Sequence, residues 1–274
     1  MNVKNVIRSC GAGLMLGGLL LFSNCSTVPL TGRSQMNLLP ESSLVEMSLT
    51  NYGDFLKENK VSPNQSQGDM VKRVGSRISA AVERYLTENG FQDRLADFKW
   101  EFNLVDDATP NAWCMPGGKV VFYSGILPLT QNEAGIAVVM GHEIAHAVAR
   151  HGNERMSQGL LIQMGGIALS EAVKQKPQET QALFLAAYGV GSQVGIMLPY
   201  SRKHEYEADE LGLIFMSMAG YNPNEAVAFW TRMSQQGGPK PPEFLSTHPV
   251  DTKRIERIQS LLPKAMTYYP KGAK

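Results

Sequence analysis

Two histidines lie four residues apart in this sequence, His142 and His146, and Glu143 directly follows the first of them. On an α-helix, side chains four residues apart lie one turn apart on the same face, so both imidazoles can bind one metal ion. Glu143 then lies beside the ion, where its carboxylate can accept a proton from an activated water molecule. The pattern therefore predicts a metal-dependent hydrolytic site, and ligands of this kind favour one Zn²⁺ ion per chain.

A third ligand must come from elsewhere, since a catalytic zinc ion usually has three protein ligands and one water. His151 is near in sequence, but the metzincin pattern needs Gly at position 149 and His at position 152. Ala149 and Gly152 fail both requirements. Glu205 is the better candidate because Asp209 follows it by one helical turn and can accept a hydrogen bond from a ligand imidazole.

Further segments complete a specific pattern. They are His142-Glu143-x-x-His146, Glu205-x-x-Ala208-Asp209-x-x-Gly212, Ser246-Thr247-His248-Pro249 with Arg254, Asn111-Ala112-Trp113 and Pro116-Gly117-Gly118. Over about residues 40–263 the chain resembles the gluzincin zinc metallopeptidases of the CaaX prenyl protease, HtpX, mitochondrial Oma and periplasmic BepA type. It is most similar to the short lipoprotein members, without the membrane helices or helical repeats of the others.

The resemblance implies that Glu205 is the third zinc ligand, that Asp209 supports a ligand histidine, and that His248 reaches the site from a loop. By its chemistry, His248 could donate to an oxyanion or occupy the fourth zinc position and block water, or it could simply be a loop histidine. Arg254 adds positive charge near a tetrahedral intermediate or is a solvated helix residue. Neither Glu207 nor His204 receives a role.

The elements that position these residues predict an α+β, mainly helical, zincin-like domain with a small antiparallel sheet beside the helix of His142. Residues 98–105 and Lys119–Tyr123 alternate or cluster apolar and aromatic side chains, which is typical of strands. We expect the second strand to be an edge that pairs with extended substrate. Its residues are Lys119, Val120, Val121, Phe122 and Tyr123.

Helices account for most of the remaining chain. A scaffold helix begins near Val71, and Thr130 with Glu133 forms a capping-box pattern before the helix of His142. Residues 156–173 and 182–197 predict either two packed helices or a mobile substrate gate. Later helices are expected over residues 206–219, from Asn222 onward, and over residues 251–262.

The N-terminus has the features of a secretory signal over residues 1–24, because Lys4 and Arg8 precede a short apolar run. Cys25 matches a lipidation site, although Asn24 before it leaves ordinary cleavage or an uncleaved anchor open. We expect residues 25–39 to be a tether, residues 40–263 the peptidase domain and residues 264–274 a tail. These features predict a periplasm-facing lipoprotein of the bacterial cell envelope, in the outer membrane.

Composition excludes other classes. The 274 residues are 43% hydrophobic and 19% charged, as in globular proteins, and the net charge is only +1. Removing Lys4 and Arg8 with the signal changes that charge to −1, so nucleic-acid binding has no electrostatic support. Cys114 is then the lone cysteine of the folded domain apart from Cys25, and it is expected to be a small buried residue.

These observations together predict a zinc-dependent metalloendopeptidase. Its expected substrates are unfolded or misassembled envelope polypeptides, and its expected contact with the membrane is the N-terminal lipid. Two alternatives stay open: a zinc-bound chaperone or assembly factor that does not cut, and an enzyme that modifies peptidoglycan. The sequence does not indicate an oligomeric state.

Overall fold

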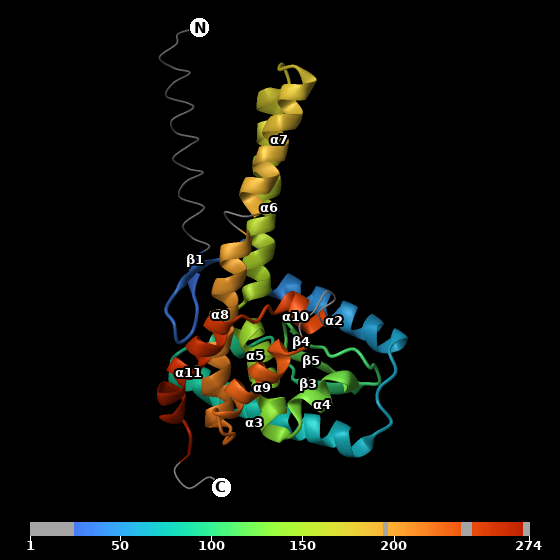
Figure 1. The fold of residues 1–274 in the computed structure, drawn as a ribbon, viewed down its shortest axis with the longest axis vertical. Helices are drawn as coiled ribbons and strands as arrows, with labels where there is room; N and C mark the ends of the chain where they lie inside the picture. Colours follow the sequence, from blue (N-terminus) through green and yellow to red (C-terminus); the bar gives the residue numbers. More distant parts are fainter. Residues whose placement is uncertain (1–24, 194–196, 237–242, 271–274) are drawn as a thin grey trace.

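The computed structural model describes residues 25–193, 197–236 and 243–270, and Figure 1 shows a mainly helical body from which a pair of helices projects. The predicted signal at residues 1–24 lies outside this range. The helices are α2 (Glu41–Glu58), α3 (Gln65–Glu88), α4 (Leu127–Thr130), α5 (Glu133–Val148), α6 (His151–Val173), α7 (Gln178–Ser192), α8 (Leu198–Met218), α9 (Glu225–Ser234), α10 (Glu243–Thr247) and α11 (Thr252–Met266), with 3₁₀ turns η1 (Gln92–Leu95) and η2 (Ser124–Ile126). The predicted fold class is confirmed.

Helices α5 and α8 form the centre of the body, and α3, α9 and α11 pack around them. Nearly every side chain of α5 is buried, as its apolar sequence requires. The two helices approach closely where Gly141 meets Gly212: a Cβ atom on Gly141 would lie 2.8 Å from the Gly212 carbonyl oxygen. This contact brings the predicted ligands of the two helices together.

The sheet beside α5 differs from the prediction. It contains β3 (Glu101–Val105), β5 (Lys119–Tyr123) and β4 (Ala112–Met115) in that order; β4 and β5 are antiparallel, whereas β3 and β5 are parallel. The predicted edge strand Lys119–Tyr123 is therefore the central strand, and its backbone is paired on both sides. The prediction was wrong because β4, at the tight turn before β5, forms the outer strand instead.

Residues 25–39 are not the tether that composition suggested. Strands β1 (Cys25–Thr27) and β2 (Ser34–Met36) form an antiparallel hairpin. The hairpin packs on the body: Val28 is fully buried, and Gln35 donates to the Ala149 carbonyl oxygen at 2.7 Å. Few apolar residues anchor this segment, so its buried polar contacts, which periodicity does not reveal, determine its place.

Several helix ends also differ from prediction. Asn132, not Thr130, caps α5, because the Asn132 side chain accepts from the Gly135 amide while the Thr130 hydroxyl donates to Leu127. Helix α8 begins at Leu198, two turns before the predicted start, and α11 continues to Met266 with Ala265 buried, so the predicted tail at residue 264 begins inside a helix. In α9, the residue at the N-cap is Asn224 rather than Asn222.

Helices α6 and α7 pack on each other and project as an arm from the body (Figure 1). Tyr188 of α7 donates to the Ile162 carbonyl oxygen of α6 at 2.8 Å. Large apolar side chains on the arm are exposed, among them Met164, Ile167 and Leu183, each more than 60% accessible. None of the helices in the described part of the chain combines the length and the apolar content that a membrane span requires.

Candidate metal centre

Three elements bring four donor side chains together. Helix α5 supplies His142 and His146, α8 supplies Glu205, and His248 follows α10. One ligand atom from each residue lies within 4.8 Å of every other. The structure thus juxtaposes the three predicted ligands, and it adds His248 to the same cluster.

The separations within this cluster fit a zinc ion. The Nε2 atoms of His142 and His146 are 3.1 Å apart, and they lie 3.3 and 3.4 Å from the nearer Glu205 oxygens. His248 Nδ1 lies 3.2 Å from His142 Nε2 and 3.0 Å from Glu205 Oε2. Donor atoms bound at about 2.0–2.1 Å to a tetrahedral zinc ion stand roughly 3.3 Å apart, so the separations among His142, His146 and Glu205 have the size that such an ion requires.

Glu143 lies beside these donors and is 4% exposed. Its Oε1 atom is buried and makes no hydrogen bond to any described residue, although His248 Nε2 is 3.4 Å away. Burial raises the pKa of Glu143 above its ordinary value. A buried carboxylate oxygen without a donor is suited to receive a proton from a small molecule bound in the cluster.

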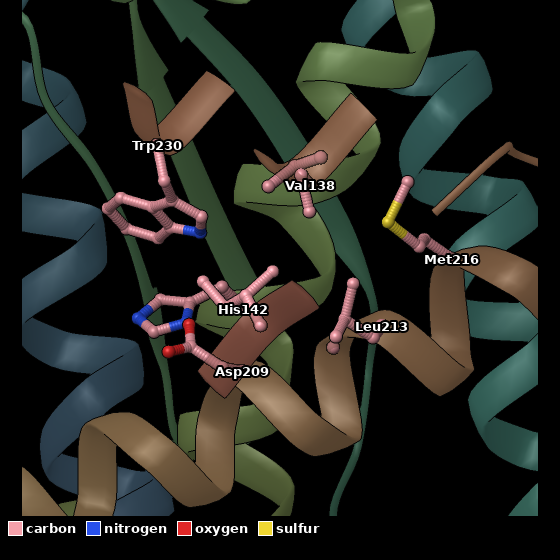
Figure 2. A pocket seen from close by; sticks show the side chains of 9 residues that line it. Val138, His142, Asp209, Leu213, Met216 and Trp230 are labelled. Carbon is pink, nitrogen blue, oxygen red and sulfur yellow. The ribbon is translucent and has the colours of Figure 1, made fainter. Parts of the chain in front are cut away.

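Asp209 and Arg254 support His142 from behind. Asp209 Oδ1 lies 3.0 Å from His142 Nδ1, and Arg254 donates to both Asp209 oxygens at 2.8 Å. Figure 2 shows the Asp209 carboxylate against the His142 ring, with the Trp230 indole beside them. The adjacent cavity, lined also by Val138, has a volume of about 10 Å³ and can hold no more than about one water.

Arg254 is therefore neither solvated nor directed to the cleft as a free charge. Its side chain is 2% exposed and stacks 4.0 Å from the centre of the Trp230 ring. It also lies 3.0 Å from both Glu205 Oε2 and the Pro249 carbonyl oxygen, so it fixes the segment after His248. These contacts give Arg254 a bracing role in this arrangement, and its action on a tetrahedral intermediate stays a prediction.

The electrostatics favour a cation. Burial alone would lower the pKa of His142, but hydrogen bonds to Asp209 and Glu205 raise it to about 9. Burial alone would raise the pKa of Glu205, but His146, His142 and His248 lower it well below its ordinary value. Ionised carboxylates facing basic nitrogens in a buried site provide the charge and donor set that bind a divalent metal.

Sequence reasoning missed the support of His146, which comes from His151, Glu207 and Arg33. Arg150 adopts a left-handed conformation (φ 58°) between α5 and α6, which turns the chain so that His151 Nδ1 lies 2.9 Å from His146 Nδ1. His151 Nε2 lies 3.0 Å from Glu207, and Arg33 binds the same carboxylate. Burial lowers the pKa of His151 to about 4, so the ring is neutral at pH 7. The five-residue spacing of the histidines gave a weak signal, and the distant Arg33 gave none.

His204 and Glu154 extend the same buried network. His204 Nε2 lies 3.0 Å from Glu154, and the His204 ring stacks on His151 with centroids 4.4 Å apart. His204 is therefore not the bystander that the sequence suggested, and Glu207, which the sequence left without a role, contacts His151. Both lie on α8 within one turn of Glu205, so this helix presents its donor and these supporting groups from the same turn.

A cleft of about 200 Å³ opens beside the donors. Cys114 and Pro116 at the end of β4 line one side, and His146, Glu205 and His248 line another. Strand β4 pairs only with β5 among the described residues, so its outer edge is the one available beside the donors. Cys114 is only partly exposed to the solvent. Burial of its thiol, together with the nearby charge of Glu143, raises the pKa of that thiol well above the ordinary value.

Comparison with known proteins identifies relatives over most of the chain. Residues 73–262 match the model of peptidase family M48. The mitochondrial metalloendopeptidase OMA1 of Schizosaccharomyces pombe is 34% identical over 93% of this chain and 72% of its own length. Human OMA1 is 31% identical over 96% of this chain and 52% of its own. The β-barrel assembly-enhancing protease of Yersinia pestis is 29% identical over 86% and 51%.

These relatives contradict the predicted location. The relatives from Schizosaccharomyces pombe, Saccharomyces cerevisiae, Bos taurus and Homo sapiens, each matched over at least 93% of this chain, are named as mitochondrial enzymes. The expectation of a bacterial outer-membrane lipoprotein facing the periplasm is therefore wrong. It depended on the short apolar N-terminus and the pattern at Cys25, and a short apolar segment does not distinguish one membrane system from another. Lipidation of Cys25 stays a prediction.

Proposed function

Because this chain belongs to peptidase family M48 and is a metalloendopeptidase, we propose that it cleaves unfolded or misassembled polypeptides with zinc held by His142, His146 and Glu205. The observation that carries this proposal is the spacing of the donor atoms, 3.1 to 3.4 Å among these residues, beside the buried carboxylate of Glu143. A structural zinc site needs no such neighbouring base.

Zinc bound there would act as a Lewis acid and make water a nucleophile near neutral pH. Glu143 takes the proton of the attacking water and returns it to the leaving amine, which its raised pKa assists. Asp209 holds His142, and Arg254 holds Asp209, so the donors keep their positions while charge develops.

His248 provides a restraint on this reaction. Its Nδ1 atom completes a set of four donors, and its Nε2 atom lies 3.4 Å from Glu143. In this position the ring occupies the place that water needs, so of the two roles left open by the sequence we favour blocking. Cleavage then requires the segment after α10 to move His248 away from Glu205.

Substrate binding is proposed at β4 (Ala112–Met115) rather than at β5. An extended backbone can pair with the outer edge of β4, and this recognition depends little on side chains, which suits unfolded substrates. Bacterial relatives are named β-barrel assembly-enhancing proteases, and others are mitochondrial enzymes. The name of the bacterial relatives supports polypeptides that have failed to assemble as the substrate class.

One observation favours a second candidate, a zinc-bound chaperone that does not cut. Four protein donors surround the proposed ion, and closed sites of four ligands are typical of structural zinc. The chaperone would hold unfolded polypeptides at β4 without hydrolysing them. Glu143 has no function in this alternative, so changing it distinguishes the two.

The test is cleavage of casein by the purified protein with one equivalent of zinc. We expect slow cleavage by the unchanged protein, none by Glu143→Gln, and faster cleavage by His248→Ala. Zinc content measured on each protein confirms that the variants retain the ion. If the unchanged protein and His248→Ala both bind zinc and neither cuts casein or another unfolded protein, the peptidase hypothesis is rejected in favour of the chaperone.

A further inference from the structure

A buried polar chain connects the N-terminal hairpin to His146. Arg33 lies between β1 and β2, and its side chain is 12% exposed. Its guanidinium donates to Glu207 Oε2 from Nε at 3.0 Å and from Nη2 at 2.7 Å. It also donates to both oxygens of Glu154 at 2.8 Å. One planar group thus fixes two carboxylates, one on α8 and one on α6.

The chain continues from Glu207 through His151 to His146. The distances are 3.0 Å between Glu207 Oε2 and His151 Nε2, and 2.9 Å between the Nδ1 atoms of His151 and His146. A carboxylate only accepts hydrogen bonds, so Nε2 of His151 carries a proton, and in the neutral His151 ring Nδ1 is then the acceptor. His146 must then carry its proton on Nδ1, which leaves the Nε2 lone pair directed toward His142 and Glu205.

We propose that Arg33 is a positioning residue for His146, acting through Glu207 and His151. The inference rests on the proposed function, since it takes His146 as a metal ligand. Arg33 orients the Glu207 carboxylate, Glu207 orients the His151 ring, and His151 selects the tautomer of His146 that binds metal. Docking of the hairpin and metal binding are therefore coupled, and coupling between two sites acts in both directions.

The chain offers a matched comparison for this role. Arg94 in η1 also ties the hairpin to the body, since it donates to the Thr27 carbonyl oxygen at 2.5 Å and to the Val148 carbonyl oxygen at 2.8 Å. Its other hydrogen bond, to Gln35 at 3.4 Å, also joins it to the hairpin, and among the described residues none is found to Glu207 or Glu154. Loss of Arg94 loosens the same hairpin without removing the group that orients Glu207.

The experiment compares Arg33→Gln, Arg33→Lys and Arg94→Gln in the full chain. Zinc affinity is measured by competition with a chromogenic chelator, and the ligand geometry by the visible spectrum of the cobalt-substituted protein. We expect Arg33→Gln to weaken zinc binding about 10-fold or more and to change the cobalt spectrum, because partners of ligand histidines contribute about 10–100-fold. Arg33→Lys is expected to recover part of the loss, and Arg94→Gln to change the affinity less than about twofold.

A measurement on the unchanged protein covers the case in which Arg33→Gln does not fold. Removing zinc with a chelator is expected to speed amide hydrogen exchange in residues 25–36, while adding zinc restores protection. Unchanged hydrogen exchange in these residues overturns the proposal. So does a folded Arg33→Gln protein that keeps the zinc affinity and the cobalt spectrum of the unchanged protein. An equal loss of zinc affinity in Arg94→Gln overturns it as well. His146→Ala separates the premises: if it binds zinc normally, the proposed metal site itself fails.

Discussion

The pair of Arg254 and Asp209 gives a quantitative test of how the site is braced. Both side chains are almost wholly buried, at 2% and 4% exposure, and two hydrogen bonds of 2.8 Å join them. In Arg254→Met the methionine can keep the contact with Trp230, but Asp209 loses its cation. The buried Asp209 carboxylate then keeps only its contact with His142. Glu205 loses its ion pair with Arg254 as well.

The expected cost follows from this burial. Removing one partner of a buried ion pair costs about 3–5 kcal/mol, because the remaining charge is desolvated without compensation. For a domain of this size each kcal/mol changes Tm by about 2–4 °C, so Arg254→Met should lower Tm by about 6–20 °C. The matched variant is Arg73→Met, which breaks the exposed pair of Arg73 and Glu133, with side chains 53% and 33% accessible. Exposed pairs contribute about 0–1 kcal/mol, so that change should be small.

The assay is thermal and urea unfolding of the metal-free proteins, including the double variant Asp209→Asn with Arg254→Met. The double variant should be no less stable than Arg254→Met alone, because the unpaired charge has been removed with its partner. A loss below about 1 kcal/mol in Arg254→Met would refute the reasoning. So would losses that add to within about 0.5 kcal/mol in the double variant, since additivity means that the two groups do not interact.

Two further predictions concern packing and pH. Gly212→Ala should lower the free energy of unfolding in urea by about 1–3 kcal/mol, because its Cβ atom would lie 2.8 Å from the His142 amide nitrogen. Gly159→Ala, with open space around it in α6, should leave stability unchanged or raise it. Equal effects of the two changes would contradict the close approach of α5 and α8. Burial alone would raise the pKa of Glu154, but His204 and Arg33 lower it to about 2. The ionised carboxylate therefore stabilises the fold fully above about pH 4.5, and that contribution is lost as the pH falls toward 2. The urea midpoint of the metal-free protein should therefore fall more steeply over this range than that of Glu154→Gln, and parallel curves would contradict the shift.

The side chains that the sequence placed together, and that the structure also brings together, are those whose relation is local. His142 and His146 share one helix, as do Glu205 and Asp209, so a spacing of four residues already places each pair on a common face. The mainly helical class followed from the same periodicity. By contrast, strand order depends on pairing between distant segments, and nothing within Lys119–Tyr123 states whether it has one neighbour or two. Its continuous burial distinguishes it from β3 and β4, but that burial becomes visible only once the fold is known.

The support of His146 was hidden for a related reason. Arg33 and Glu207 are separated by 174 residues, and neither belongs to a periodic pattern with the other. A polar segment without periodicity is the composition expected of a tether, yet here polar side chains are what anchor it. Buried ion pairs of this kind leave no hydrophobic signature, so such anchoring can be recognised only once the fold is known.

Both ligand histidines of α5 are held by the same arrangement, and this links the two ends of the described chain to the site. His142 contacts Asp209, and Arg254 of α11 fixes the Asp209 carboxylate. His146 contacts His151, which in turn contacts Glu207. Arg33 of the hairpin fixes the Glu207 carboxylate. In each case a carboxylate of α8 lies between a histidine nitrogen and an arginine from a terminal element. The arginines offset the negative charge of the α8 carboxylates. Without them, the buried carboxylates of Glu205, Glu207 and Asp209 would repel one another. The site therefore requires both terminal elements in place, and the long central helices alone would bring the donors together without fixing the orientation of either ring.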